Sequence, residues 1–172
     1  YLILESTYPS DIQFSFILAE ISYRKGNVKI AQEKYWNIYI KDPSQIQALS
    51  RAAELSKING ELEFSFKAFE KLVLIQPENI QFWKNYSELA SSLKIIDKAI
   101  DGFNNLARLS NNDPIIKERL GILYFENNQF TKSDSIFSSL YNNGEISPGI
   151  LYYKTRMAII EQDFDSAEFF SS

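Results

Sequence analysis

A short pattern, Pro-x-x-Ile-Gln, occurs three times in this sequence at a constant spacing. The copies begin at Pro9, Pro43 and Pro77, so the two intervals between them are equal. A constant period of about 34 residues is typical of repeat proteins, in which each unit stacks on its neighbours and no unit folds alone. The period therefore constrains the fold more strongly than any other feature of the chain.

The period predicts one array that covers residues 1–172. Full repeats are expected at 12–45, 46–79, 80–113 and 114–147, with a partial fifth repeat at 148–172 and the end of a preceding repeat at 1–11. The last repeat stops inside its second predicted helix, and terminal repeats normally carry a polar cap. We therefore interpret the chain as a segment of a longer protein.

Three columns of the aligned repeats keep their chemistry. One column is small throughout and reads Ala19, Ala53, Ser87, Gly121, Thr155. A second small column reads Ala31, Ser65, Ala99, Ser133, Ala167. A third is aromatic and reads Tyr35, Phe69, Phe103, Phe137. Small residues let two helices approach closely, so we expect helices A and B to pack together at the small columns. The aromatic column is expected to be buried and to fill the space toward the next repeat.

Each repeat contains two stretches with apolar residues at helical spacing, helix A and then helix B. Gly26 and Gly60 lie between the two stretches, where a helix end often needs the positive φ that glycine tolerates. The prolines follow helix B, which they cannot continue. Side-chain oxygens near the start of helix A are expected to cap it. The candidate caps are Ser10, Asp11, Ser44 and Asn79.

These features resemble the tetratricopeptide repeat (TPR) family, whose units are helix–turn–helix motifs of about 34 residues. The residues that carry the resemblance are Trp83, Leu120-Gly121, Tyr124, the small and aromatic columns, and Pro9, Pro43 and Pro77. The sequence departs from the family pattern at Lys94, where a turn glycine is usual, and at Asn111, where the closing proline is usual. The resemblance implies an all-α fold, a right-handed α-solenoid of antiparallel helix pairs.

Composition argues against several other classes of protein. The net charge is −4, and nucleic-acid-binding proteins normally present a basic face. The chain has no histidine and no cysteine, which removes the commonest general base, nucleophile and metal ligands. No apolar stretch approaches the roughly 20 residues that a membrane-spanning helix needs. We therefore expect no catalytic residues, no metal site, no cofactor, no nucleic-acid partner and no membrane span in this segment.

The resemblance to TPR proteins implies a ligand groove formed by the helix A faces. Candidate protein-binding residues at groove places are Gln13, Glu20, Gln47, Glu54, Gln81, Lys84, Glu88, Ile122, Phe125, Tyr152 and Tyr153. The glutamates and glutamines form two rows in the first three repeats, and an ordinary solvated helix face explains them as well as a ligand does. The aromatic residues of the last two repeats are equally consistent with internal packing.

The function that the sequence predicts is a non-catalytic scaffold that binds a peptide or a partner protein. Two alternatives remain open, a substrate-selecting segment of a larger enzyme and a self-assembly module that associates through its end helices. Composition is typical of a bacterial protein, and both the cytoplasm and the periplasm are consistent with a chain that lacks cysteine.

Overall fold

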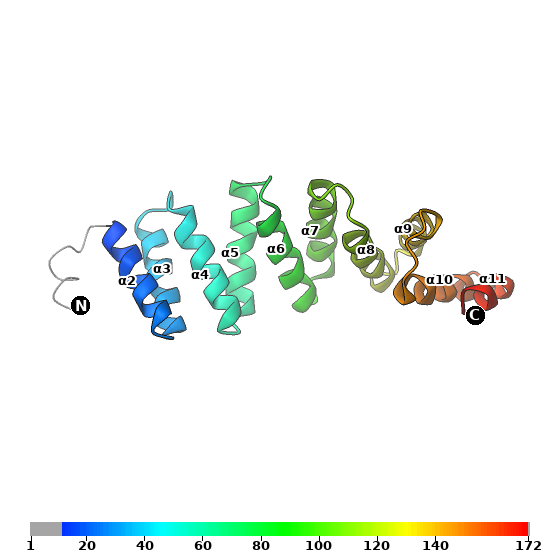
Figure 1. Ribbon diagram of the computed structural model, residues 1–172, viewed down its shortest axis with the longest axis horizontal. Coiled ribbons are helices and arrows are strands. Elements are labelled where there is room, and N and C mark those ends of the chain that lie inside the picture. Colours follow the sequence, from blue (N-terminus) through cyan, green and yellow to red (C-terminus); the bar gives the residue numbers. More distant parts are fainter. Residues whose placement is uncertain (1–11, 172) are drawn as a thin grey trace. The chain divides into compact units, whose positions relative to one another are not determined.

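The computed structural model describes residues 12–171, and every regular element in that range is an α-helix (Figure 1). The first helices of the pairs are α2 (Ile12–Arg24), α4 (Ile46–Ile58), α6 (Ile80–Ser92), α8 (Pro114–Glu126) and α10 (Pro148–Ile160). The second helices are α3 (Val28–Lys41), α5 (Leu62–Ile75), α7 (Ile96–Leu109), α9 (Phe130–Asn142) and α11 (Phe164–Ser171). The predicted all-α fold is confirmed.

The period of the sequence is visible in the helix bounds. Each helix A contains 13 residues, and the five start at one constant interval, from Ile12 to Pro148. The second helices start at the same interval, from Val28 to Phe164. A spacing that repeats so regularly in the backbone reflects the same pair of apolar faces recurring in each unit.

In all five pairs, the residue at one position of the turn between helix A and helix B has a left-handed backbone conformation. Gly26 and Gly60 have a φ of +79°, and the equivalent residues Lys94, Asn128 and Gln162 have φ values between 56° and 62°. The amides of this residue and the next bond back to the end of helix A. In the first pair, for example, Gly26 N–H donates to Tyr23 O and Asn27 N–H donates to Ser22 O. This is the Schellman pattern, which satisfies the last carbonyls of a helix.

A glycine at position 94 should therefore stabilise the protein. Left-handed backbone costs a residue with a Cβ roughly 1–2 kcal/mol, while glycine loses more entropy on folding, so we expect Lys94→Gly to gain about 1 kcal/mol. The matched control is Lys98→Gly inside α7, which should lose about 1 kcal/mol. Urea unfolding of both variants measures the difference, and a loss for Lys94→Gly would contradict the assigned turn.

The starts of the first helices confirm one predicted cap and correct another. Asn79 Oδ1 accepts from the Phe82 amide at 3.2 Å, as predicted. Ser44 does not cap α4, because its amide and its hydroxyl both donate to the Asp42 carboxylate and Gln45 occupies the cap position. Ser10 and Asp11 lie outside the described residues. In the fourth and fifth pairs, the caps stand directly before a proline and are Asp113 and Ser147.

The small columns bring the two helices of each pair together. Ala19, Ala31 and Ala53 are completely buried. Where the second column holds serine, the hydroxyl bonds across the pair. Ser65 Oγ donates to Ala53 O at 2.8 Å, and Ser133 Oγ donates to Gly121 O at 2.9 Å. The predicted close approach of helices A and B is therefore confirmed in these pairs, and the serines are buried without an unsatisfied hydroxyl.

The contacts divide the chain into two compact units, with the boundary inside α6 between Leu89 and Ala90. The core of the first unit contains Ala19 of α2, Tyr35 and Ile38 of α3, and Leu55 of α4. The core of the second unit contains Phe137, Leu140 and Ile150 from α9 and α10. The predicted burial of the aromatic column is confirmed, since its four members are at most 6% exposed. That the whole chain is one array, and part of a longer protein, stays a prediction.

No helix between residues 12 and 171 is both long enough and apolar enough to cross a membrane.

Candidate functional site

The helix A faces of the first unit enclose a hollow of about 450 Å³ between α2 and α4. Two of the predicted site residues, Glu20 and Gln47, line it. Phe16, Ile17 and Ile21 of α2 supply its apolar surface. Ile17 has 53% of its surface exposed, which is a large fraction for an isoleucine within a packed pair. The hollow thus combines an accessible apolar side chain with charged and amide groups.

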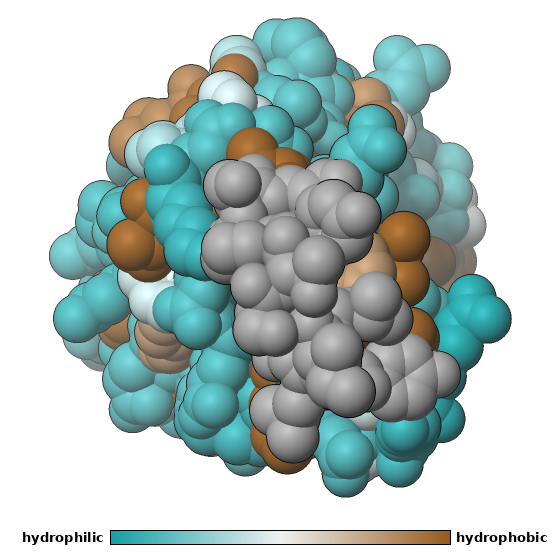
Figure 2. All heavy atoms as spheres, turned by 90° about the vertical axis from the view of Figure 1, so that its left-hand side faces the viewer, coloured by the Kyte–Doolittle hydropathy of each residue, from teal (hydrophilic) through white to brown (hydrophobic). Residues whose placement is uncertain are grey.

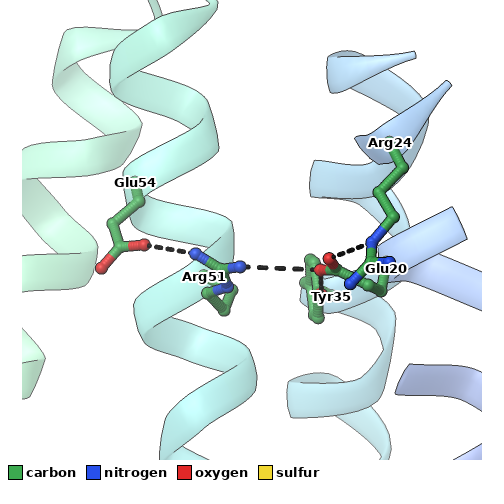
Figure 3. A network of polar contacts seen from close by, with 5 residues as sticks. All are labelled: Glu20, Arg24, Tyr35, Arg51 and Glu54. Carbon is green, nitrogen blue, oxygen red and sulfur yellow. Dashed lines mark hydrogen bonds and ion pairs between the residues drawn. The ribbon is translucent and has the colours of Figure 1, made fainter. Parts of the chain in front are cut away.

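Glu20 is the centre of a polar network that joins three helices (Figure 3). Its carboxylate accepts from Arg24 Nε at 2.9 Å, one turn further along α2, and from the Tyr35 hydroxyl of α3 at 3.2 Å. Arg51 of α4 reaches the same carboxylate at 3.6 Å and also pairs with Glu54 at 3.2 Å. Arg51 therefore connects two neighbouring members of the predicted glutamate row.

The network shifts the pKa of Glu20 and of Tyr35. The hydrogen bond from Arg24 lowers the pKa of Glu20, and the bond from Tyr35 acts in the same direction. Burial raises the pKa of Tyr35, and the negative charge of Glu20 raises it further. Glu20 is therefore ionised and Tyr35 is neutral near pH 7, so the hydroxyl is held as a donor to the carboxylate.

The third glutamate of the row is also paired. Lys57 of α4 lies 3.2 Å from Glu88 and donates to Asn85 Oδ1 at 3.1 Å, both on α6. The row therefore alternates in sign, with three carboxylates (Glu20, Glu54, Glu88) and three cations (Arg24, Arg51, Lys57). The row is not the uncompensated acidic surface that the glutamates alone suggested.

The cations were missing from the predicted site, although part of the signal was in the sequence. Glu20–Arg24 and Arg51–Glu54 are four and three residues apart, the spacings that place side chains together on a helix. The contacts of Arg51 with Glu20 and of Lys57 with Glu88 join different repeats. They require the stacking of the units as well as the sequence.

The predicted glutamine row is exposed. Gln13, Gln47 and Gln81 all lie at the second position of a helix A and face solvent, as does Lys84. In the described part of the chain, the amide groups of these three glutamines bond to no other side chain, and they are able to donate to and accept from a ligand backbone.

The predicted site residues of the second unit gather into one aromatic cluster. Tyr153 stacks on Phe137 at 5.1 Å with an angle of 3° between the rings, and Phe125 meets Tyr153 edge to face at 5.2 Å. Ile122 packs against the same core. Burial raises the pKa of Tyr153. The sequence left open that these aromatic places pack internally. Internal packing therefore accounts for the buried part of Ile122, Phe125 and Tyr153.

Tyr152 is the accessible member of this cluster, with 52% of its surface exposed. Arg156, one turn later, donates to the Tyr152 hydroxyl at 2.9 Å. Its guanidinium also lies 5.1 Å from the centre of the Phe125 ring and 5.7 Å from that of Tyr152. Such cation–π contacts hold an arginine in place while its outer edge still faces solvent. Arg156 was not among the predicted site residues.

Seen from the side of α2, the part of the face that is coloured by hydropathy is mostly hydrophilic, and hydrophobic groups are interspersed singly or in small clusters (Figure 2). Among residues 12–171, no three acidic side chains gather where they could hold a metal ion together.

No family model matches this sequence, and no curated protein matches it. The fold, in contrast, has clear counterparts among solved structures, and TPR proteins are among them. The chain therefore has the TPR fold that its repeats predicted.

Three of these counterparts illustrate the likeness. YrrB, a TPR protein with an unusual peptide-binding site, has a TM-score of 0.74 and 14% identity, and the match covers 98% of this chain and 87% of YrrB. A TPR protein from Parabacteroides merdae ATCC 43184 has a TM-score of 0.69 and 16% identity over 92% of this chain and 63% of the other. MamA has a TM-score of 0.68 and 13% identity, covering 93% of this chain and 86% of MamA. At these identities the likeness concerns the fold.

Proposed function

We propose that this chain is a non-catalytic scaffold that binds an extended segment of a partner protein on its helix A faces. The observation that carries the proposal is the hollow between α2 and α4, where the exposed Ile17 lies beside the Glu20–Arg51 network. An apolar contact flanked by fixed polar groups is the usual composition of a peptide-binding surface.

The polar groups of this hollow are held in place before any ligand arrives. Arg24, Tyr35 and Arg51 restrict the Glu20 carboxylate from three sides. Gln47 contributes an amide with no side-chain partner among the described residues. Groups that are ordered in advance lose less entropy on binding, which raises affinity without adding contacts. The peptide-binding site of YrrB, a protein of the same fold, supports a peptide ligand by analogy.

The charge pattern suggests which ligand would fit. Because the carboxylates and cations alternate, the face favours a segment with mixed charges and backbone hydrogen bonds over a purely basic one. Each exposed ion pair contributes only about 0.2–1 kcal/mol, so the accessible Ile17 is expected to supply much of the binding energy.

Site-specific photo-cross-linking tests this proposal. The photoreactive residue benzoylphenylalanine replaces Ile17 in one variant and Ile40 in another. Ile40 is the matched control, because it is an isoleucine of α3 with 57% exposure that lies on a helix B. After irradiation in cells that make the protein, we expect a discrete cross-linked partner from position 17 and not from position 40.

The partner identified in this way then serves in a binding assay. Ile17→Glu should weaken its binding about tenfold and Ile40→Glu by less than about twofold, as expected for the loss of one apolar contact. Equal cross-linking from both positions, or equal affinity of the two glutamate variants, would place the interaction elsewhere and reject the helix A face.

A further inference from the structure

The second unit contains a larger hollow, of about 680 Å³, that none of the predicted site residues line. It lies among α7, α8 and α9. Buried Ala107 and Leu120 lie at its floor, and Tyr124 and Ile136 add partly buried walls. Its volume falls within the ~300–1,000 Å³ that is usual for ligand sites. The residues of α8 that line it, Lys117, Leu120 and Tyr124, occupy different places from those of the helix A groove.

The hollow is basic in a chain that carries a net charge of −4. Arg108, Lys117 and Lys132 line it, together with asparagine, threonine and serine side chains, and no aspartate or glutamate belongs to its described lining. Lys132 Nζ lies 5.2 Å from the centre of the Tyr124 ring and donates to Gln129 Oε1 at 2.9 Å. One cation is therefore oriented by neutral groups.

Lys117 is the most informative of the three cations. The residue is partly buried, and no carboxylate among the described residues pairs with it. An anionic ligand would supply the counter-ion that the described part of the chain does not.

The preceding repeat is packed differently at the place of Lys117. Lys117 stands in the same column as Trp83, which lies one repeat earlier and is the one tryptophan of that column. The indole of Trp83 is 8% exposed, donates to Pro77 O at 2.7 Å and meets the ring of Tyr86 edge to face. The fourth repeat has a lysine at this place, and the lysine lines an open space.

We infer that this hollow binds an acidic segment of a partner protein, with carboxylate or phosphate groups of the segment contacting Lys117 and Lys132. Two cations a few ångströms from a peptide favour acidic side chains over neutral ones. The exposed asparagine and hydroxyl groups around the rim can bond to the peptide backbone. This site is separate from the helix A faces, so the chain would present two different binding surfaces.

The test uses three probes, fluorescein-labelled octaglutamate, octaglutamine, and the octaglutamate peptide with two phosphoserines in place of two glutamates. Fluorescence anisotropy at low salt should show binding of both acidic peptides and not of octaglutamine, and binding should weaken as salt is raised. The phosphoserine peptide separates phosphate from carboxylate as the preferred anion.

Matched variants locate the binding. Lys117→Gln/Lys132→Gln should weaken binding of octaglutamate about tenfold. The control Lys67→Gln/Lys71→Gln removes the same number of charges from exposed positions of α5 and should change affinity less than about twofold. Lys117→Trp introduces the residue that stands at the equivalent place in the preceding repeat. We expect it to abolish binding without lowering the melting temperature.

Two results would overturn the inference. One is equal weakening by the two double variants, which would mean that only the net charge matters. The other is full competition by inorganic phosphate at about millimolar concentration, which would define a site for a small anion rather than for a peptide. The melting temperature of each variant, followed by circular dichroism, excludes unfolding as the cause of any loss.

Discussion

Replacement of Phe69 by alanine is expected to destabilise the first unit by about 3–5 kcal/mol. Phe69 is completely buried, and its ring lies 6.2 Å from that of Phe82. It belongs to the aromatic column that fills the space between repeats, so alanine leaves a cavity that rigid helices on several sides cannot close. Urea unfolding followed by far-UV circular dichroism measures the loss.

Two control variants make this prediction specific. Phe169→Ala removes the same atoms from a side chain that is 66% exposed, and should change stability by less than about 0.5 kcal/mol. Phe69→Leu keeps most of the buried volume and should cost less than half as much as Phe69→Ala. Equal losses for Phe69→Ala and Phe169→Ala would show that the aromatic column does not form the core.

The helix pairs could be predicted because the period is carried by many residues at once. The small columns recur in all five repeats and the buried aromatic column in four, so a single departure does not change the pattern. The turns show this best. Gly26 and Gly60 predicted a left-handed residue, and Lys94, Asn128 and Gln162 adopt the same conformation without a glycine. Packing of the flanking helices imposes that backbone, and the local residue type only sets its cost.

The site was harder to predict because its chemistry depends on contacts between repeats. The column of Glu20, Glu54 and Glu88 was visible in the sequence. Which cation approaches which carboxylate depends on side-chain directions across α2, α4 and α6, for which one sequence has no signal. The basic hollow illustrates the same point. The difference between Trp83 and Lys117 is visible in aligned repeats, while the hollow beside Lys117 is visible only in the three-dimensional structure.

Ala31→Trp is expected to cost about 3 kcal/mol or more, because adding volume to a well-packed contact typically costs about 1–3 kcal/mol and tryptophan adds far more than one methylene. Ala31 is completely buried at the point where α3 meets α2, against the equally buried Ala19. The larger side chain must separate the two helices or leave its preferred rotamer. Thermal unfolding by circular dichroism should show a large fall in melting temperature.

The control for this variant comes from the repeats themselves. Ser65 and Ser133 occupy the equivalent position, and each hydroxyl donates to a carbonyl oxygen of its helix A. Ala31→Ser should therefore find the Ala19 carbonyl in the same geometry and change stability by less than about 1 kcal/mol. An unchanged melting temperature for Ala31→Trp would mean that the two helices do not meet at this column. A large loss of stability for Ala31→Ser would instead mean that the first pair is not equivalent to the others at this column. The serine hydroxyl lacks its carbonyl acceptor only if the two helices approach each other differently.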